Sequence, residues 1–164
     1  MTTIRLSDLA RVLGVALHST DAAITGLAID SRAVTTGDLF VAIRGDRLDG
    51  NDFIEEALAR GAAAVVSSQT LSHSIPHLTV TDSGAACAAF GRLVRESFGG
   101  VVAGITGSAG KTTAKAFLTA ICASTDRTVA TEGNQNNELG VPLTLAKLLS
   151  APKFGVVEMG AAQV

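Results

Sequence analysis

Short apolar runs separated by polar, glycine-rich loops make up the first half of the chain. The runs with the length and residue types of β-strands are residues 15–18, 24–29, 39–43, 63–67 and 78–81. Between the third and fourth runs, apolar side chains recur at helical spacing across residues 53–58. We therefore expect residues 1–81 to form a small mixed α/β domain at the N-terminus.

Longer helices are expected after residue 82. Apolar side chains recur at helical spacing in 85–98, 111–123 and 143–149, and these stretches alternate with the short apolar runs 101–105, 128–130 and 154–157. Strands that alternate with helices are typical of a parallel sheet. The pattern therefore predicts an α/β chain of two domains, with residues 82–164 forming the first part of a parallel-sheet domain.

A glycine-rich stretch joins the apolar run 101–105 to the helix that begins near Lys111. A strand, a glycine-rich turn and a helix N-terminus in this order form a cradle for phosphate, because free N–H groups and the helix dipole point to one place. The strict phosphate-loop pattern requires glycine at position 105, where this chain has Ile105. We nevertheless predict a nucleoside triphosphate site, which makes this a P-loop ATPase-type domain. Its residues are Thr106, Gly107, Ser108, Ala109, Gly110, Lys111, Thr112 and Thr113.

Three side chains near this loop are candidates for chemistry. Lys111 can reach the outer phosphates, and the Thr112 hydroxyl can ligate Mg²⁺. Glu158 ends the last apolar run, and ligands collect at the carboxyl ends of parallel strands. We expect Glu158 to ligate the same Mg²⁺, although an acidic residue that caps a turn is the simpler interpretation.

Residues 131–142 are too rich in asparagine and glycine for a core strand. Side-chain amides in such a loop can donate hydrogen bonds to an oxyanion, which makes Asn134 and Asn137 candidates for catalysis. An ordinary asparagine–glycine turn explains the composition nearly as well.

Polar loops of the first domain carry Ser31, Arg32 and Arg47. These side chains could bind an anionic or heterocyclic group, although from spacing alone solvated loop residues are the better interpretation. Pure turns would require only glycine, asparagine and proline.

Composition excludes several classes of function. The formal net charge is −2 at pH 7, and the chain has no run of Lys or Arg, no Trp and no Tyr, so binding to nucleic acid is not expected. No apolar run reaches the length of a membrane span, and no secretory leader is apparent. We expect a cytoplasmic monomer without membrane insertion, in which Cys87 and Cys122 are reduced.

Several separated motifs together resemble the Mur ligase family. The N-terminal motifs are Asp30-Ser31-Arg32, Gly37 to Ala42, Asp49-Gly50, Asp52 to Ile54 and Gly61-Ala62, and the loop Thr106 to Thr112 is similar to the family's ATP loop. The stretches Gly133 to Leu145 and Val157 to Ala161 look like those of the members that add D-alanyl-D-alanine. The resemblance covers essentially the whole chain.

The resemblance implies an ATP-dependent amide ligase of peptidoglycan precursor synthesis. Its substrates would be UDP-N-acetylmuramoyl-tripeptide and D-alanyl-D-alanine, joined through an acyl phosphate. In this comparison Lys111 and either Asn134 or Asn137 act on the phosphoryl group, Thr112 and Glu158 hold Mg²⁺, and Ser31 with Arg32 lines the UDP pocket. Asn51 departs from the family, which often has histidine after the Asp-Gly pair.

Mur ligases are much longer than 164 residues, so the resemblance implies either a fragment of a longer protein or a truncated product. In both cases the adenine and amino-acid sites are expected to lie beyond residue 164, and the chain is expected to be inactive alone. Two other classes remain as alternatives. A different P-loop NTPase would use the same loop, although the chain lacks the N-K-x-D and D-x-x-G sequences of GTPases. A non-catalytic module that binds nucleotides or UDP-sugars is the second alternative.

Overall fold

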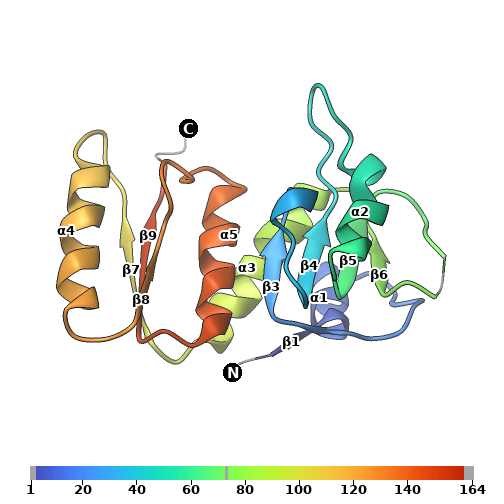
Figure 1. Cartoon of the computed structure of the whole chain (residues 1–164), viewed down its shortest axis with the longest axis horizontal. Coiled ribbons are helices and arrows are strands. Elements are labelled where there is room, and N and C mark those ends of the chain that lie inside the picture. The colour runs from blue at the N-terminus through green and yellow to red at the C-terminus, as the bar shows by residue number, and fades with distance from the viewer. Residues whose placement is uncertain (1–2, 73, 161–164) are drawn as a thin grey trace.

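Two parallel β-sheets lie side by side in the computed structural model, which describes residues 3–72 and 74–160 (Figure 1). The first sheet has the order β3-β4-β5-β6, and the second has the order β7-β9-β8. A short antiparallel pair, β1 with β2, lies beside the first sheet. These arrangements confirm the predicted α/β class with parallel sheets.

The strands of the first half are β1 (Ile4–Arg5), β2 (Ala23–Ile24), β3 (Gly26–Ala28), β4 (Asp38–Val41), β5 (Ala64–Ser67) and β6 (His77–Thr79). Its helices are α1 (Leu6–Leu13), the 3₁₀ turns η1 (Ser31–Ala33) and η2 (Gly50–Phe53), and α2 (Ile54–Ala59). The second half contains α3 (Ser83–Ser97), β7 (Val101–Ile105), α4 (Lys111–Ala123), β8 (Thr128–Ala130), α5 (Gly140–Ala146), η3 (Lys147–Ser150) and β9 (Phe154–Glu158).

Both faces of the first sheet are buried. Along β4, Leu39 and Val41 face the core that α1 and α3 cover, while Phe40 and Ala42 belong to the core under α2. Successive strand residues point to opposite faces, so a strand covered on both sides must be apolar throughout. This explains why residues 39–41 of β4 and 64–66 of β5 are continuous apolar runs rather than alternating ones.

Helices cover the second sheet on both faces as well. α4 packs on β7, β8 and β9 from the outer side, and α5 packs on β9 from the side of the first sheet (Figure 1). The central strand β9 is buried, whereas β7 lies at the edge. The carboxyl ends of these parallel strands lie at the same edge of the sheet, where the candidate site is expected.

Helix α3 joins the cores of the two halves. Phe90 and Val94 of this helix belong to the same buried cluster as Leu39 of the first sheet and Leu148 of η3. α3 also packs closely on α5, because a Cβ atom added at Gly91 would lie 2.9 Å from Pro142 Cα. The two sheets therefore share one continuous core, and the domain boundary between residues 81 and 82 stays a prediction.

One predicted strand is wrong. Residues 15–18 form no regular structure, although Val15 and Leu17 pack against the main core. Half-buried and exposed side chains alternate along these residues, but no neighbouring strand in the described part of the chain supplies the hydrogen bonds of a ladder. The predicted loop 131–142 is shorter than expected because α5 begins at Gly140. Ala161, which belongs to the last motif, lies outside the described residues.

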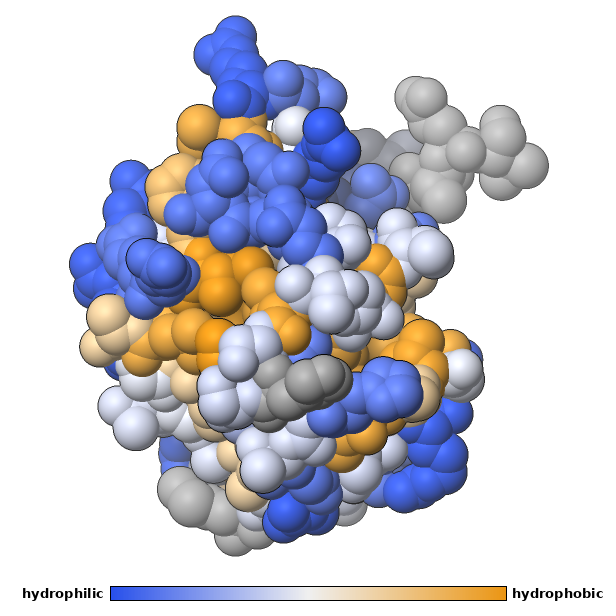
Figure 2. All heavy atoms as spheres, turned by 90° about the vertical axis from the view of Figure 1, so that its right-hand side faces the viewer, coloured by the Kyte–Doolittle hydropathy of each residue, from blue (hydrophilic) through white to orange (hydrophobic). Residues whose placement is uncertain are grey.

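The surface mixes apolar and polar patches. Figure 2 views the side that carries β6, where orange apolar surface lies among blue polar side chains. Leu71 and Ile75, which precede β6 in the chain, are partly buried against the core under α2. Within the described ranges, no helix has the length and apolar character needed to cross a bilayer.

Replacing Phe90 by Ala should destabilise both halves together, because the ring is fully buried in the shared core. We expect the free energy of unfolding to fall by about 3–5 kcal/mol, measured by urea denaturation. Phe117→Ala is the matched control, since 68% of Phe117 is exposed on α4, and its effect should stay within about 0.5 kcal/mol. Separate transitions for the two sheets in the Phe90 variant would contradict a shared core.

Candidate nucleotide and UDP-sugar sites

The loop between β7 and α4 has the geometry of a phosphate cradle. Gly110 is the N-cap of α4 with a left-handed φ of 76°, a conformation that L side chains rarely adopt. The first N–H groups of a helix have no intrahelical acceptors, so those of α4 are available to an anion. Lys111 folds back over the loop, where its Nζ donates to the carbonyl oxygen of Gly107 at 2.7 Å. This lysine therefore lies at the loop that its proposed role requires.

Glu158 lies next to this loop because of the register between β7 and β9. Ile105, the last residue before the loop, pairs with Glu158 in the parallel ladder. The N–H of Met159 donates to the carbonyl oxygen of Ile105 at 2.9 Å, which continues the pairing beyond the strands. The register thus places a carboxylate, of which only 1% is exposed, beside the first turn of α4.

Three side chains contact the Glu158 carboxylate, and a fourth accepts from its backbone N–H. Asn136 Nδ2 donates to Oε1 at 2.9 Å, and Thr112 Oγ1 lies 3.5 Å from the same oxygen. Lys115 Nζ lies 3.0 Å from Oε2, and the Glu158 N–H donates to Thr131 Oγ1. Hydrogen bonds from Lys115 and then Asn136 lower the pKa of Glu158 below its ordinary value, so the carboxylate is charged at neutral pH.

Thr112 and Glu158 fit the requirements of Mg²⁺. A hydroxyl and a carboxylate are hard oxygen ligands, and Mg²⁺ commonly takes one or two protein oxygens with phosphate oxygens and water. Adjacent ligands in an Mg²⁺ octahedron lie roughly 3 Å apart, given metal–oxygen distances of about 2.0–2.1 Å. The 3.5 Å separation of Thr112 Oγ1 and Glu158 Oε1 is close to this value.

The asparagines of the loop 131–139 have different partners. Asn137 Oδ1 accepts from the Gly140 N–H at 2.8 Å and so caps α5. The side chain of Asn134 is exposed, and its carbonyl oxygen accepts from the Asn136 N–H. Asn136, which the sequence analysis did not select, is the one that contacts Glu158. Composition gave no means to choose among three neighbouring asparagines, and the catalytic roles of Asn134 and Asn137 stay predictions.

Lys115 is a second residue that the sequence analysis missed. Its Nζ contacts Glu158 and also donates to the Gly133 carbonyl oxygen at 2.6 Å. The only indication of Lys115 in the sequence is a single lysine, four residues after Lys111, in an otherwise largely apolar helix. A lysine at such a position is either exposed to solvent or buried in an ion pair. Only the packing of α4 on β9 distinguishes these two environments.

The three residues predicted to bind the UDP-sugar line one pocket of about 720 Å³ in the first half. Ser31 and Arg32 come from η1, and Arg47 comes from the loop after β4, so segments distant in sequence converge. Phe40 and Phe53 also line this pocket and give it apolar walls. Mixed apolar and charged walls suit a ligand with a ring and an anionic group.

Existing contacts fix two of these three side chains. Ser31 Oγ donates to Glu56 Oε2 at 2.7 Å. The guanidinium of Arg32 donates to both carboxylate oxygens of Asp30, with distances of 3.0 and 2.7 Å. Hydrogen bonds from Arg32 lower the pKa of Asp30 to about 2. A ligand would therefore meet a preformed arrangement at η1.

Asn51, the position that departs from the family, has a structural role. It is buried, and its amide donates to Asp49 and Ser68 and accepts from Ser67 Oγ. These bonds hold η2 against the end of β5. The structure therefore gives a reason for Asn51 that does not involve a ligand.

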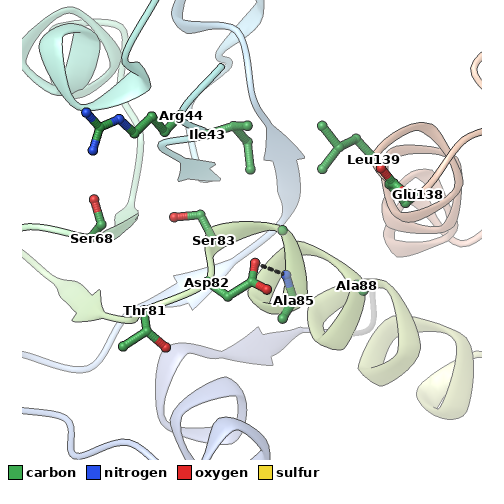
Figure 3. Close-up of a pocket in the computed structure, with 11 residues that line it drawn as sticks. Ile43, Arg44, Ser68, Thr81, Asp82, Ser83, Ala85, Ala88, Glu138 and Leu139 are labelled. Carbon is green, nitrogen blue, oxygen red and sulfur yellow. Dashed lines mark hydrogen bonds between the residues drawn. The ribbon is translucent and has the colours of Figure 1, made fainter. Parts of the chain in front are cut away.

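A second pocket, of about 810 Å³, lies between the two halves at the start of α3 (Figure 3). Arg44 and Ser68 line it from the first half, and Glu138 and Leu139 line it from the loop before α5 (Figure 3). Asp82 caps α3 here by accepting from the Ala85 N–H at 2.8 Å. This pocket shares Ile43 with the pocket of Ser31, Arg32 and Arg47.

A third pocket continues toward Glu158. It has a volume of about 870 Å³ and shares Ala88 and Glu138 with the second pocket. Its walls include Asn136, which contacts Glu158, and Met159, which follows it in sequence. The three pockets therefore share lining residues in series, from the first half to Asn136 and Met159.

Comparison with known families places this fold and site in a class of ligases. The pattern of the Mur ligase family, catalytic domain, matches residues 23–90, and that of the Mur ligase middle domain matches residues 105–164. The chain therefore belongs to the Mur ligase family.

Individual relatives carry more specific names. The chain is 37% identical over 161 residues to the UDP-N-acetylmuramoyl-tripeptide–D-alanyl-D-alanine ligase of Escherichia coli K12, covering 98% of this chain and 36% of the relative. It is 38% identical over 147 residues to the ligase of the same name from Treponema pallidum, covering 82% of this chain and 32% of the relative.

Solved structures agree with these relatives. The structure of MurF from Acinetobacter baumannii matches with a TM-score of 0.81 and 31% identity, over 98% of this chain and 36% of that one. MurF ligase from Thermotoga maritima in complex with ADP matches with a TM-score of 0.70 and 36% identity, over 84% of this chain and 32% of that one. The chain thus spans about a third of the length of these proteins.

Arg32→Ala should raise the pKa of Asp30 from about 2 toward its ordinary value of 3.8, because the guanidinium bonds are lost. The rise should be incomplete, since the backbone N–H of residue 32 still donates to Asp30. A carbon-13 NMR titration of the Asp30 carboxyl group measures both values.

The sign of the effect on stability follows from a lowered pKa in the folded state. The contribution of Asp30 is present above pH 3.8 and is lost as the pH falls through about 2. Arg11→Ala is a control, because Arg11 pairs with Asp8 on α1. An unchanged Asp30 titration in Arg32→Ala would contradict the assigned cause.

Proposed function

We propose that this chain provides the UDP-sugar site and the ATP phosphate site of a Mg²⁺-dependent ligase. The ligase joins D-alanyl-D-alanine to UDP-N-acetylmuramoyl-tripeptide in peptidoglycan precursor synthesis. The relatives named after this reaction and the ADP-bound neighbour support the proposal. The observation that carries it is the pairing of Ile105 with Glu158, which puts a buried carboxylate beside a phosphate loop.

The chemistry requires activation of a carboxylate. In the proposed reaction, the terminal carboxylate of the tripeptide attacks the γ-phosphorus of ATP, ADP leaves, and an acyl phosphate forms. The amine of D-alanyl-D-alanine then attacks the acyl carbon, and phosphate leaves as the amide forms. Both steps increase negative charge on oxygens, so cationic groups and hydrogen-bond donors at the phosphate loop accelerate them.

Each residue of the loop has a role in this scheme. Lys111 offsets charge on the transferring phosphoryl group, and the N–H groups at the start of α4 bind the phosphates. Thr112 and Glu158 would hold Mg²⁺, which supplies charge neutralisation at the phosphate oxygens when bound. Asn136 orients Glu158 through its 2.9 Å bond to Oε1. Asn134 and Asn137 are proposed to approach the acyl phosphate.

The three adjoining pockets suit an elongated substrate. The UDP group would occupy the pocket of Ser31, Arg32 and Arg47, and the muramoyl peptide would extend past Ile43 and Glu138 toward Glu158. This path would bring the peptide carboxylate to the phosphate loop. A substrate that spans both halves also explains why α3 connects them rigidly through a shared core.

Binding of UDP-N-acetylmuramic acid to this chain should perturb the NMR signals of Ser31, Arg32 and Arg47. Arg47→Ala should weaken binding about tenfold or more, because hydrogen bonds to charged groups contribute about 1.5–3 kcal/mol. Arg11→Ala, on the far side of the first sheet at α1, is the matched control and should bind as the wild type does. Perturbations confined to residues outside this pocket would refute the assignment.

Lys111→Ala, made in the full ligase that carries this chain, should lower turnover by about 10²–10³ while ATP binding survives. The lysine stabilises charge that develops mainly in the transition state, whereas the backbone N–H groups remain. Thr112→Ala and Glu158→Gln should instead raise the Mg²⁺ concentration required for half-maximal rate. Ligase rates measured against Mg²⁺ concentration distinguish the loss of a phosphate-binding charge from the loss of a metal ligand. A wild-type Mg²⁺ curve for Glu158→Gln would show that Glu158 is not a metal ligand.

A further inference from the structure

A buried lysine beside the phosphate loop has no role in the reaction described above. Lys115 lies one turn after Lys111 on α4, and only 8% of its surface is exposed. Buried ammonium groups are rare unless partners compensate the charge. The identity and position of its partners therefore indicate what it does.

The partners of Lys115 come from two different segments. Its Nζ lies 3.0 Å from Glu158 Oε2 at the end of β9, and it donates to the Gly133 carbonyl oxygen at 2.6 Å in the loop after β8. The ammonium therefore connects α4, β9 and the asparagine loop at one point.

This contact fixes the direction of the Glu158 carboxylate. Oε2 faces Lys115, while Oε1 lies 2.9 Å from Asn136 Nδ2 and 3.5 Å from Thr112 Oγ1. The carboxylate is planar, so fixing one oxygen restricts the other. Lys115 thereby restricts the orientation in which the carboxylate presents its other oxygen to Thr112.

We propose that Lys115 is a positioning residue that holds Glu158 with Oε1 presented, beside Thr112, to the divalent cation of the nucleotide. The proposal rests on the proposed function, because it takes Thr112 and Glu158 as ligands of that cation. Lys115 acts through Glu158 and not on the nucleotide directly.

Other roles for Lys115 lead to different results. A lysine that acted only as a nearby positive charge would repel the cation, and its removal would tighten cation binding. A lysine that served only the packing of the fold would affect thermal stability and leave cation affinity unchanged. A positioning residue predicts weaker cation binding, and loss of a group that orients a metal ligand typically costs about 10–100-fold in affinity.

The test measures binding of Mn²⁺, as a spectroscopic substitute for Mg²⁺, to this chain in the presence of ADP. Electron paramagnetic resonance reports free Mn²⁺ during the titration. Lys115→Met keeps the length of the side chain and removes its charge, and we expect its Mn²⁺ dissociation constant to rise about 10–100-fold. The affinity for ADP without metal should change little, since the N–H groups of the phosphate loop remain.

Two further variants make the result specific. Lys153→Met is the matched control, because Lys153 is an exposed lysine just before β9, 3.5 Å from Asp126, and its loss should leave Mn²⁺ binding unchanged. The double variant Lys115→Met with Glu158→Gln should bind Mn²⁺ as weakly as Glu158→Gln alone, since Lys115 acts through that carboxylate. It also removes both charges of the buried pair, so we expect it to fold even if Lys115→Met alone is destabilised by an unpaired buried carboxylate.

Unchanged or tighter Mn²⁺ binding in Lys115→Met would overturn the proposal, as would a double variant weaker than Glu158→Gln. A wild-type chain that binds neither ADP nor Mn²⁺ would reject the nucleotide site itself, and the role of Lys115 with it. Normal wild-type binding with an unaffected Lys115→Met variant would reject the role of Lys115 alone.

Discussion

The parallel pairing of β7 with β9 brings Glu158 to the phosphate loop, and the remaining features of the site depend on this register. A shift of one residue would turn Glu158 to the other face of the sheet, away from Thr112 and Lys115. The pairing also determines the position of Asn136, because the Gly160 N–H donates to its carbonyl oxygen. A single strand register thus sets the distances among residues from three separate segments.

The buried carboxylate has a consequence for the stability of the site. A charge in such a position is destabilising without compensation, and here Lys115 and Asn136 both contact it. A site intended for a divalent cation needs a charged carboxylate before the cation arrives. The same contacts lower the pKa of Glu158, so they keep the carboxylate charged and oriented. Lys115 and Asn136 thus both compensate the buried charge and keep the carboxylate ionised.

The shared core determines how the two halves can cooperate. α3 packs on the first sheet, on α1 and on α5, and Gly91 allows the close approach to α5. The pockets between the halves are consequently lined by side chains whose backbones are fixed relative to one another.

The amino-acid sequence was sufficient to predict the α/β class, most of the helices and strands, and the phosphate loop. These features depend on periodicity, glycine and local turn chemistry, all of which act over a few neighbouring residues. It did not determine that residues 15–18 lack a strand partner, that Asn136 rather than its neighbours contacts Glu158, or that Lys115 is buried. Each of these depends on which segments pack together across long sequence separations. Only the tertiary structure decides them, because a hydrogen bond or an ion pair between distant residues leaves no periodic signal in the chain.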